Sequence, residues 1–217
     1  WYLGKVYEVL DFRSWAEEGE PLTSSQVNEK KRQVDEAVAA AIPIVDKITW
    51  GTATPEEIET YNFLDAVAFS TIRQLIGLDE LDLAVTGAAP MTPELLQWFR
   101  AIGVPLSEIY GMSESTGPIS FAARRPKVGT VGPAVPGLTL AIADDGEVIF
   151  KGGNVFKGYL NLPEKTAETF TDDGWLRTGD VGTVDEDGFY RITDRMKDII
   201  ITAGGKNVTP SELENEL

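Results

Sequence analysis

The chain has 217 residues, with 35 Asp and Glu against 19 Lys and Arg, and it contains neither Cys nor His. These counts exclude a disulfide, a cysteine nucleophile, a Ser-His-Asp triad and a metal site built on His or Cys within the chain. The net charge of −16 opposes non-specific binding to nucleic acid or to an anionic membrane. A phosphate-bearing ligand would therefore need local backbone amides, a cation and a few basic side chains.

The overall composition is that of a soluble globular protein. The chain is 42% hydrophobic and 25% charged, and it has no apolar stretch of transmembrane length. We expect a cytoplasmic location, with a peripheral association with membranes left open. The sequence starts at Trp1 without an initiator Met and stops soon after a helix pattern begins at Ser211. Both ends favour a fragment of a larger protein.

Residues 1–80 are predicted to be mostly helical. Ser24 or Ser25 is expected to cap a first helix whose apolar residues recur at helical spacing, with Pro43 as a kink or break. Thr54, followed by Pro and two Glu, predicts a second helix start. No residue in this part indicates a chemical role.

A different pattern begins near Asp82, where short apolar runs alternate with a helix pattern. A strand over 83–85, a helix opened by Thr92 and Pro93 that runs through Phe99, and a strand over 105–109 predict a βαβ unit in an α/β sheet. Polar loops follow both strands, the second of them over 110–114. Because ligands of such sheets bind beyond the carboxyl ends of the strands, we expect a site there.

After residue 128 the chain is rich in Gly, Pro and β-branched residues, which predicts a β-rich layer. We expect strands near 138–143, 147–150, 180–184 and 188–193, with one helix near 163–169. The segment Asp185–Gly188 has some likeness to a calcium loop, but it lacks the further acidic positions that such a loop needs. We interpret it as a hairpin turn.

Single polar residues in this region have ordinary explanations when each is taken alone. Glu114 could be a surface carboxylate or a cation ligand, and Asp180 could be a turn residue at a strand end. Arg195 and Lys197 lie between two acids and could form a solvated ion-pair cluster. The glycine pairs do not make a dinucleotide-binding fingerprint.

Taken in order, however, six motifs resemble the successive core motifs of the AMP-forming adenylating enzymes, the superfamily of acyl-CoA synthetases, peptide-synthetase adenylation domains and luciferases. The motifs are Thr86–Pro90, Tyr110–Glu114, Gly152–Tyr159 with Asn161, Gly174–Asp180, Asp194–Asp198 and Gly204–Val208. The residues Tyr-Gly-Met-Ser-Glu (110–114) and Gly-Gly-Lys-Asn-Val-Thr-Pro (204–210) are similar to the motifs of the long-chain fatty acyl-CoA synthetases, including their bubblegum-type members.

The resemblance implies a fold and a reaction. The fold is part of an α/β acyl-adenylating large domain, a βαβ sheet plus a β-rich subdomain, ending at the start of the small C-terminal domain. The implied parts are a helical part (1–80), an α/β nucleotide-binding part (81–127), a β-rich subdomain (128–193) and the hinge with the start of the C-terminal domain (194–217). A fatty acid would react with ATP to give acyl-AMP, and CoA would then displace AMP. Positioning and charge neutralisation do most of the work in such a displacement, which suits a chain without His or Cys.

The resemblance also implies roles for the residues of the first two motifs. Gly87, Ala88 and Ala89 would border the adenine and the acyl pocket. Tyr110 would lie against the purine, with Gly111 and Met112 in the same nucleotide-binding segment. Ser113 would bond near the α-phosphate, and Glu114 would bind Mg²⁺, so these two are the predicted catalytic residues.

The later motifs imply contacts to the sugar and a moving domain. Asp180 would accept both ribose hydroxyls and Arg195 would donate to the same sugar, with Ile192 near the base. Lys197 matches the hinge about which the small domain rotates, and Gly204 and Gly205 match a loop that faces CoA.

Two departures from the family pattern limit this expectation. The glycine-rich phosphate loop is not found in these residues, and the late Lys that completes adenylation would lie beyond Leu217. We therefore expect the isolated chain to have little or no ligase activity. Two alternatives stay open: an acyl-AMP ligase or adenylation domain that feeds a carrier protein, and a non-catalytic module that binds a nucleotide or an acyl group.

Overall fold

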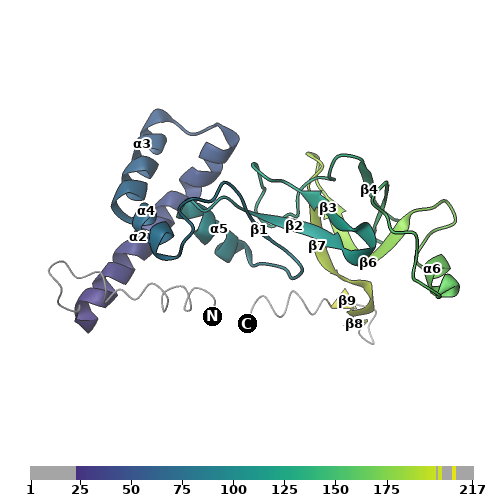
Figure 1. Ribbon diagram of the computed structural model, residues 1–217. Helices are drawn as coiled ribbons and strands as arrows, with labels where there is room; N and C mark the ends of the chain where they lie inside the picture. The colour runs from purple at the N-terminus through teal and green to yellow at the C-terminus, as the bar shows by residue number, and fades with distance from the viewer. Residues whose placement is uncertain (1–22, 199, 202–206, 209–217) are drawn as a thin grey trace. The chain divides into compact units, whose positions relative to one another are not determined.

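The computed structural model describes residues 23–198, 200–201 and 207–208 (Figure 1). These residues form two compact units. One contains the described residues up to Ala84 together with Pro93–Leu106, and the other contains Val85–Thr92 and the described residues from Ser107 onward. The predicted boundaries at residues 80, 127 and 193 stay predictions.

The described part of residues 1–80 is mostly helical, as predicted, and belongs to the first unit. Its elements are α2 (Ser24–Trp50), α3 (Pro55–Leu64), a π-helical segment (Asp65–Phe69), α4 (Ser70–Leu75) and α5 (Pro93–Ala101). Thr54 caps α3 as predicted, but the prediction that Ser24 or Ser25 caps α2 was wrong. Thr23 is the cap, because its side chain accepts from the backbone N–H of Gln26 while the Gln26 side chain accepts from the backbone N–H of Thr23.

Pro43 does not break α2, which runs without interruption to Trp50 (Figure 1). Proline removes one backbone hydrogen bond from a helix interior. Val38, Ala41 and Ile44 are all buried on the same helix around that position. The burial of this apolar face offsets the lost hydrogen bond. The predicted break at Pro43 was therefore wrong, and the alternative of a kink stays a prediction.

A three-stranded sheet contains the first predicted strands. Its order is β1 (Ala84–Thr86), β2 (Leu106–Met112) and β3 (Gly117–Phe121), with α5 between β1 and β2 in the chain. The predicted order of strand, helix and strand is confirmed. The residues Tyr110–Met112, expected in a loop, belong instead to β2 and pair with β3.

The β-rich layer is a four-stranded antiparallel sheet whose strands follow chain order. It consists of β4 (Leu138–Ile142), β5 (Glu147–Gly152), β6 (Leu176–Val184) and β7 (Tyr190–Arg195), with α6 (Pro163–Glu168) between β5 and β6 in sequence. The expected hairpin turn after β6 is confirmed, since the backbone of Asp185 pairs with that of Phe189 at 3.0 Å and Gly188 has a φ of +81°. The short strands β8 (Ile200–Ile201) and β9 (Asn207–Val208) form a separate pair.

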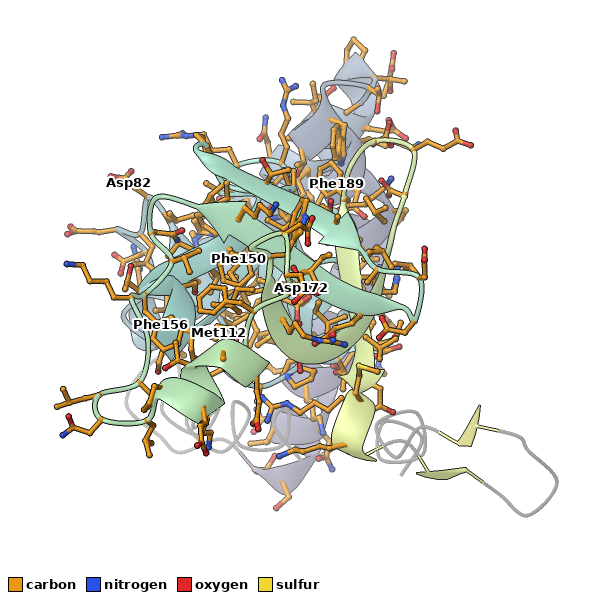
Figure 2. All side chains as sticks on the ribbon, turned by 90° about the vertical axis from the view of Figure 1, so that its right-hand side faces the viewer. Asp82, Met112, Phe150, Phe156, Asp172 and Phe189 are labelled. Atoms are coloured by element: carbon orange, nitrogen blue, oxygen red, sulfur yellow. The ribbon has the colours of Figure 1, made fainter. Side chains whose placement is uncertain are left out.

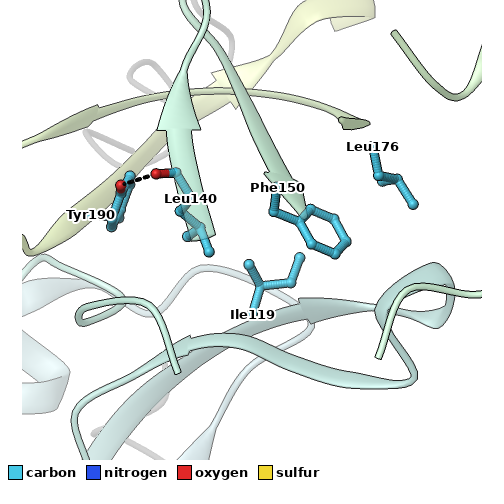
Figure 3. Close-up of a cluster of buried hydrophobic side chains, with 5 residues drawn as sticks. All are labelled: Ile119, Leu140, Phe150, Leu176 and Tyr190. Carbon is cyan, nitrogen blue, oxygen red and sulfur yellow. Dashed lines mark hydrogen bonds between the residues drawn. The ribbon is translucent and has the colours of Figure 1, made fainter. Parts of the chain in front are cut away.

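A cluster of buried side chains joins the three-stranded and four-stranded sheets. Figure 3 shows its members, among which the hydroxyl of Tyr190 donates to the carbonyl of Leu140 at 2.9 Å; they are Ile119, Leu140, Phe150, Leu176 and Tyr190. Tyr110, Met112 and Phe156 pack against this cluster and are partly buried. Met112, Phe156 and the cluster member Phe150 are labelled in Figure 2. The core therefore supports the segments that contain the predicted nucleotide-binding residues.

Within the part of the chain that the structure describes, no helix has the length and apolar character needed to cross a membrane. The cytoplasmic location and the peripheral membrane association stay predictions. Gly204 and Gly205 lie outside the described residues.

Candidate functional site

Three predicted residues from distant parts of the second unit are joined directly. The hydroxyl of Tyr110, on β2, donates to Oδ2 of Asp180, on β6, at 2.6 Å. Nε of Arg195, on β7, lies 3.1 Å from Oδ1 of the same carboxylate, because Asp180 and Arg195 are partners in the β6–β7 register. The Asp180 side chain is 11% exposed and that of Arg195 is 61% exposed. The arrangement is a largely buried carboxylate held on both oxygens, with an accessible guanidinium beside it.

The Tyr110 hydroxyl acts as a donor at any physiological pH. Burial is the main cause that raises the pKa of Tyr110 well above its ordinary value, and the hydrogen bond to Asp180 raises it further. The phenol therefore stays protonated and fixes one oxygen of Asp180.

The backbone before Asp180 leaves the regular strand geometry. Gly179 has a φ of +75°, a conformation that side chains disfavour. The hydroxyl of Thr178 donates to the carbonyl of Val148 at 2.6 Å and accepts from the N–H of Asp180 at 3.1 Å. This turn within β6 directs the Asp180 carboxylate toward Tyr110.

Glu147, for which the sequence predicted no role, binds the backbone of the same turn. Its Oε1 accepts from the N–H of Gly179 at 2.7 Å, and its Oε2 accepts from Nε of Arg177 at 2.8 Å. Glu147 is buried. A carboxylate that loses its hydration on burial needs such partners, so Glu147 and the segment Arg177–Asp180 stabilise one another.

A short 3₁₀ helix, Ser113–Ser115, follows β2 and contains the two predicted catalytic residues. The fully buried hydroxyl of Ser115 lies 2.7 Å from the carbonyl of Met112, 2.5 Å from that of Gly117 and 3.0 Å from the N–H of Met112. Gly111 is needed in this hairpin, because a Cβ there would lie 2.4 Å from the carbonyl oxygen of Gly117. The tight hairpin fixes the position of Glu114.

The loop that follows β5 docks onto this helix. The N–H of Phe156 donates to the carbonyl of Glu114 at 2.8 Å, and the hydroxyl of Thr116 donates to the carbonyl of Asn154 at 3.0 Å. The Tyr159 hydroxyl donates to Oε1 of Glu114 at 2.6 Å. That bond, followed by burial, raises the pKa of Tyr159. Tyr159 ends the sequence motif Gly152–Tyr159, from which no role for its hydroxyl was predicted.

The predicted adenine loop lies against β2. A Cβ on Gly87 would come within 2.7 Å of the carbonyl oxygen of Ile109, so only glycine allows this approach. Ala88 has a φ of +67°, a strained backbone conformation of the kind that occurs at binding sites. Gly87, Ala88 and Ala89 are all exposed. The loop therefore presents a small-residue edge next to the strand that contains Tyr110.

Of the remaining predicted residues, Met112 and Ile192 lie on β2 and β7, whereas Ser113 and Lys197 lie on the short 3₁₀ segments that follow these strands. Ile192 is half-buried on β7 and pairs with Gly182, Met112 is partly buried at the end of β2, and Ser113 and Lys197 are exposed. The structure thus brings together Tyr110, Asp180 and Arg195, and separately Glu114 and Tyr159.

The donor atoms present suit a nucleotide and a magnesium ion. Among the described residues, Tyr110 and Arg195 contact the Asp180 carboxylate, and a carboxylate has about four acceptor sites, so further hydrogen bonds can be accepted there. Glu114 is half-buried, and only one of its oxygens is held by Tyr159. Among the described residues, no group of three or more Asp or Glu side chains is placed so that it could hold a metal ion by itself. A magnesium ion held jointly by one or two carboxylates and by phosphates of a nucleotide requires no such cluster.

Residues 21–160 match the family described as AMP-binding enzyme. The chain belongs to this family.

Two curated relatives and one solved structure illustrate the likeness. The long-chain-fatty-acid–CoA ligase FadD15 of Mycobacterium bovis is 47% identical over 154 residues, covering 70% of this chain and 25% of the relative. The long-chain-fatty-acid–CoA ligase ACSBG2 of Xenopus laevis is 38% identical over 169 residues, covering 75% of this chain and 23% of the relative. O-succinylbenzoate coenzyme A synthetase (MenE) of Bacillus subtilis, in complex with ATP and magnesium ion, is similar in structure with a TM-score of 0.56 and 31% identity, covering 66% of this chain and 34% of MenE.

These shares show how much of each relative the chain represents. It spans about a third or less of the length of the curated relatives it matches. The predicted resemblance to AMP-forming adenylating enzymes, and to their long-chain fatty acyl branch, is confirmed by the family match and by the relatives.

Proposed function

We infer that the chain is part of an AMP-forming long-chain fatty acid–CoA ligase and contributes the adenosine-binding side of its active site. The observation that carries the proposal is the joined group of Tyr110, Asp180 and Arg195 in a chain of this family. The names of FadD15 and ACSBG2 support a long-chain fatty acid as the acyl substrate and CoA as the acceptor.

In this proposal each residue acts by binding or positioning. Asp180 accepts hydrogen bonds from the ribose hydroxyls while Tyr110 and Arg195 hold its carboxylate in place. The exposed hydroxyl of Ser113 donates near the α-phosphate, and Glu114 is a ligand for Mg²⁺. When bound, Mg²⁺ neutralises charge on the triphosphate. Because such a transfer depends on positioning and electrostatics, these groups suffice for their part of the site without a His or Cys.

Lys197 and Ile192 have secondary roles in the proposal. Lys197, in the 3₁₀ segment after β7, is the hinge position, and Ile192 packs near the base. CoA would approach from the side of Gly204 and Gly205. Transfer of the acyl group to a carrier protein remains the alternative for the second half-reaction.

The test uses the complete gene product that contains this chain. With palmitate, ATP and Mg²⁺ it should release pyrophosphate, and with added CoA it should form the thioester and AMP. Glu114→Ala should lower pyrophosphate release by about a hundred- to a thousandfold, the usual effect of losing a key electrostatic group. A gene product that binds ATP but releases no pyrophosphate with any fatty acid would instead favour a non-catalytic module.

Two further measurements separate the remaining alternatives. If acyl-AMP forms but CoA yields no thioester, a carrier protein is the acceptor. The isolated 217 residues should show little or no pyrophosphate release, and turnover by this chain alone would contradict our assignment of a partial site.

A further inference from the structure

The hydrogen bond between Tyr159 and Glu114 links two segments that are 45 residues apart in the chain. The same two segments are also joined through their backbones, since the N–H of Phe156 donates to the carbonyl of Glu114 at 2.8 Å. The docking does not need the Tyr159 hydroxyl. That hydroxyl instead reaches the carboxylate, where it fixes Oε1 at 2.6 Å.

Tyr159 is itself held on three sides. Its N–H donates to the hydroxyl of Thr166 at 2.9 Å, and its ring packs edge-on against Phe156 at a centroid distance of 4.9 Å. Nζ of Lys165 lies over the ring at 5.7 Å from its centroid. Gly158 permits the approach, because a Cβ there would lie 2.6 Å from Cγ2 of Thr166. A side chain so restrained offers its hydroxyl in one direction.

The Glu114 carboxylate has few other restraints. Among the described residues it has no ion-pair partner, and its Oε2 has no hydrogen bond to protein. Without Tyr159 the carboxylate would rotate freely about its terminal torsion, which is broad for Glu. With Tyr159, Oε1 is occupied and Oε2 is the oxygen left for a cation.

We propose that Tyr159 is a positioning residue that orients the Glu114 carboxylate for the divalent cation that accompanies ATP. The inference rests on the proposed function, in which Glu114 binds Mg²⁺. Removing the hydrogen-bond partner of a metal-ligating carboxylate commonly lowers the metal affinity by about tenfold or more. Tyr159 would therefore act on the metal dependence of ATP binding and leave metal-free binding of the nucleotide unchanged.

The test measures ATP binding to the complete gene product by titration calorimetry at a series of Mg²⁺ concentrations, and once in EDTA. Tyr159→Phe should raise the half-saturating Mg²⁺ concentration about tenfold, with the affinity for ATP in EDTA unaltered. Tyr190→Phe is the matched control. It removes a hydroxyl that donates to the carbonyl of Leu140 in the core, so it should lower the melting temperature without moving the Mg²⁺ dependence.

A second background shows whether Tyr159 acts through Glu114. In Glu114→Gln protein, adding Tyr159→Phe should change the half-saturating Mg²⁺ concentration by less than about twofold, because coupled residues give non-additive effects. An undiminished effect of Tyr159→Phe in that background would overturn the inference. If Tyr159→Phe does not fold, Thr166→Val replaces it, since it removes the hydroxyl that accepts from the Tyr159 N–H and carries the same expectation.

The failures of the two proposals are distinct. If the unsubstituted protein binds ATP equally with and without Mg²⁺, the magnesium role of Glu114 fails and the inference fails with it. If binding by the unsubstituted protein depends on Mg²⁺ and Tyr159→Phe has the same dependence, only the positioning role of Tyr159 is refuted.

Discussion

Glu147 accepts a hydrogen bond of 2.7 Å from the backbone N–H of Gly179, the residue immediately before Asp180. The same carboxylate binds the guanidinium of Arg177, with a shortest N···O distance of 2.7 Å. One buried acid therefore fixes two points of the segment that delivers the proposed ribose ligand.

Glu147→Gln should destabilise the protein by about 1–3 kcal/mol, because a buried charged partner of Arg177 is lost and a buried amide group is left imperfectly paired. It should also weaken AMP binding, through the displaced Asp180. Urea unfolding and calorimetric titration with AMP measure the two effects. Asp145→Asn is the control: Asp145 contacts the same Arg177 at 3.2 Å but is 44% exposed, so a change below about 1 kcal/mol is expected. Equal effects of both substitutions would contradict the role of burial.

Asp180→Asn should weaken AMP binding by at least about tenfold, since a carboxylate that accepts from Tyr110 and pairs with Arg195 becomes a neutral amide. Titration of the complete gene product with AMP measures the loss. Asp172→Asn changes charge by the same amount at an exposed turn and should leave AMP affinity unaltered. Unchanged binding by Asp180→Asn would remove this residue from the proposed site.

Gly111→Ala should destabilise the β2–β3 hairpin by about 1–3 kcal/mol, because the added Cβ meets the carbonyl oxygen of Gly117 at 2.4 Å and Cα of Pro118 at 3.0 Å. Gly153→Ala is the matched control, since a Cβ there has no atom within 4 Å and its backbone conformation accepts a side chain. Thermal or urea unfolding compares the two. A Gly111→Ala protein as stable as Gly153→Ala would show that the hairpin can relax.

Stability should fall at alkaline pH in a way that depends on Tyr61. Burial, followed by the nearby charge of Asp65, raises the pKa of Tyr61 to about 12, against about 10 in an unfolded chain. The raised value means that the unfolded state loses its proton first. The contribution of Tyr61 to stability is therefore complete below about pH 10 and is lost as the pH rises toward about 12.

Urea unfolding between about pH 9 and pH 12 checks this expectation. Tyr61→Phe should make the decline with pH less steep, because one titrating phenol is removed. An identical pH dependence in both proteins would show that Tyr61 is solvated like an ordinary tyrosine.

The sequence predicted those element boundaries that are determined by residues close to one another in the chain. The start of α3 follows from Thr54 and Glu57, which bond to each other's backbone within one turn. The predicted cap of α2 was one or two residues too late, because Ser24 and Ser25 were considered and Thr23, which has Gln26 three residues later, was not. The continuation of α2 through Pro43 depends on burial against other helices, which no local pattern reveals.

Only part of the candidate site was predicted, because some of its contacts depend on how the strands pair. The motif order identified Tyr110, Asp180 and Arg195, and the structure joins them through the antiparallel register of β6 and β7 and the placement of β2. Glu147 was missed, because an acid next to an Asp-Asp-Gly turn has the pattern of a solvated residue. Only the pairing of β5 with β6 brings Glu147 within hydrogen-bond distance of the N–H of Gly179. Tyr159 offered one signal, its place in the motif Gly152–Tyr159, but its partner lies 45 residues away.

Leu160 is 87% exposed and directly follows Tyr159. The 217 residues contain no thiol, so Leu160→Cys would give this chain one accessible attachment point for a fluorophore. A dye at that position would be attached to the residue next to Tyr159, whose hydroxyl contacts Glu114. The loop could then serve as an optical reporter of cation and nucleotide arrival, read in real time and without following the chemistry of the acyl group.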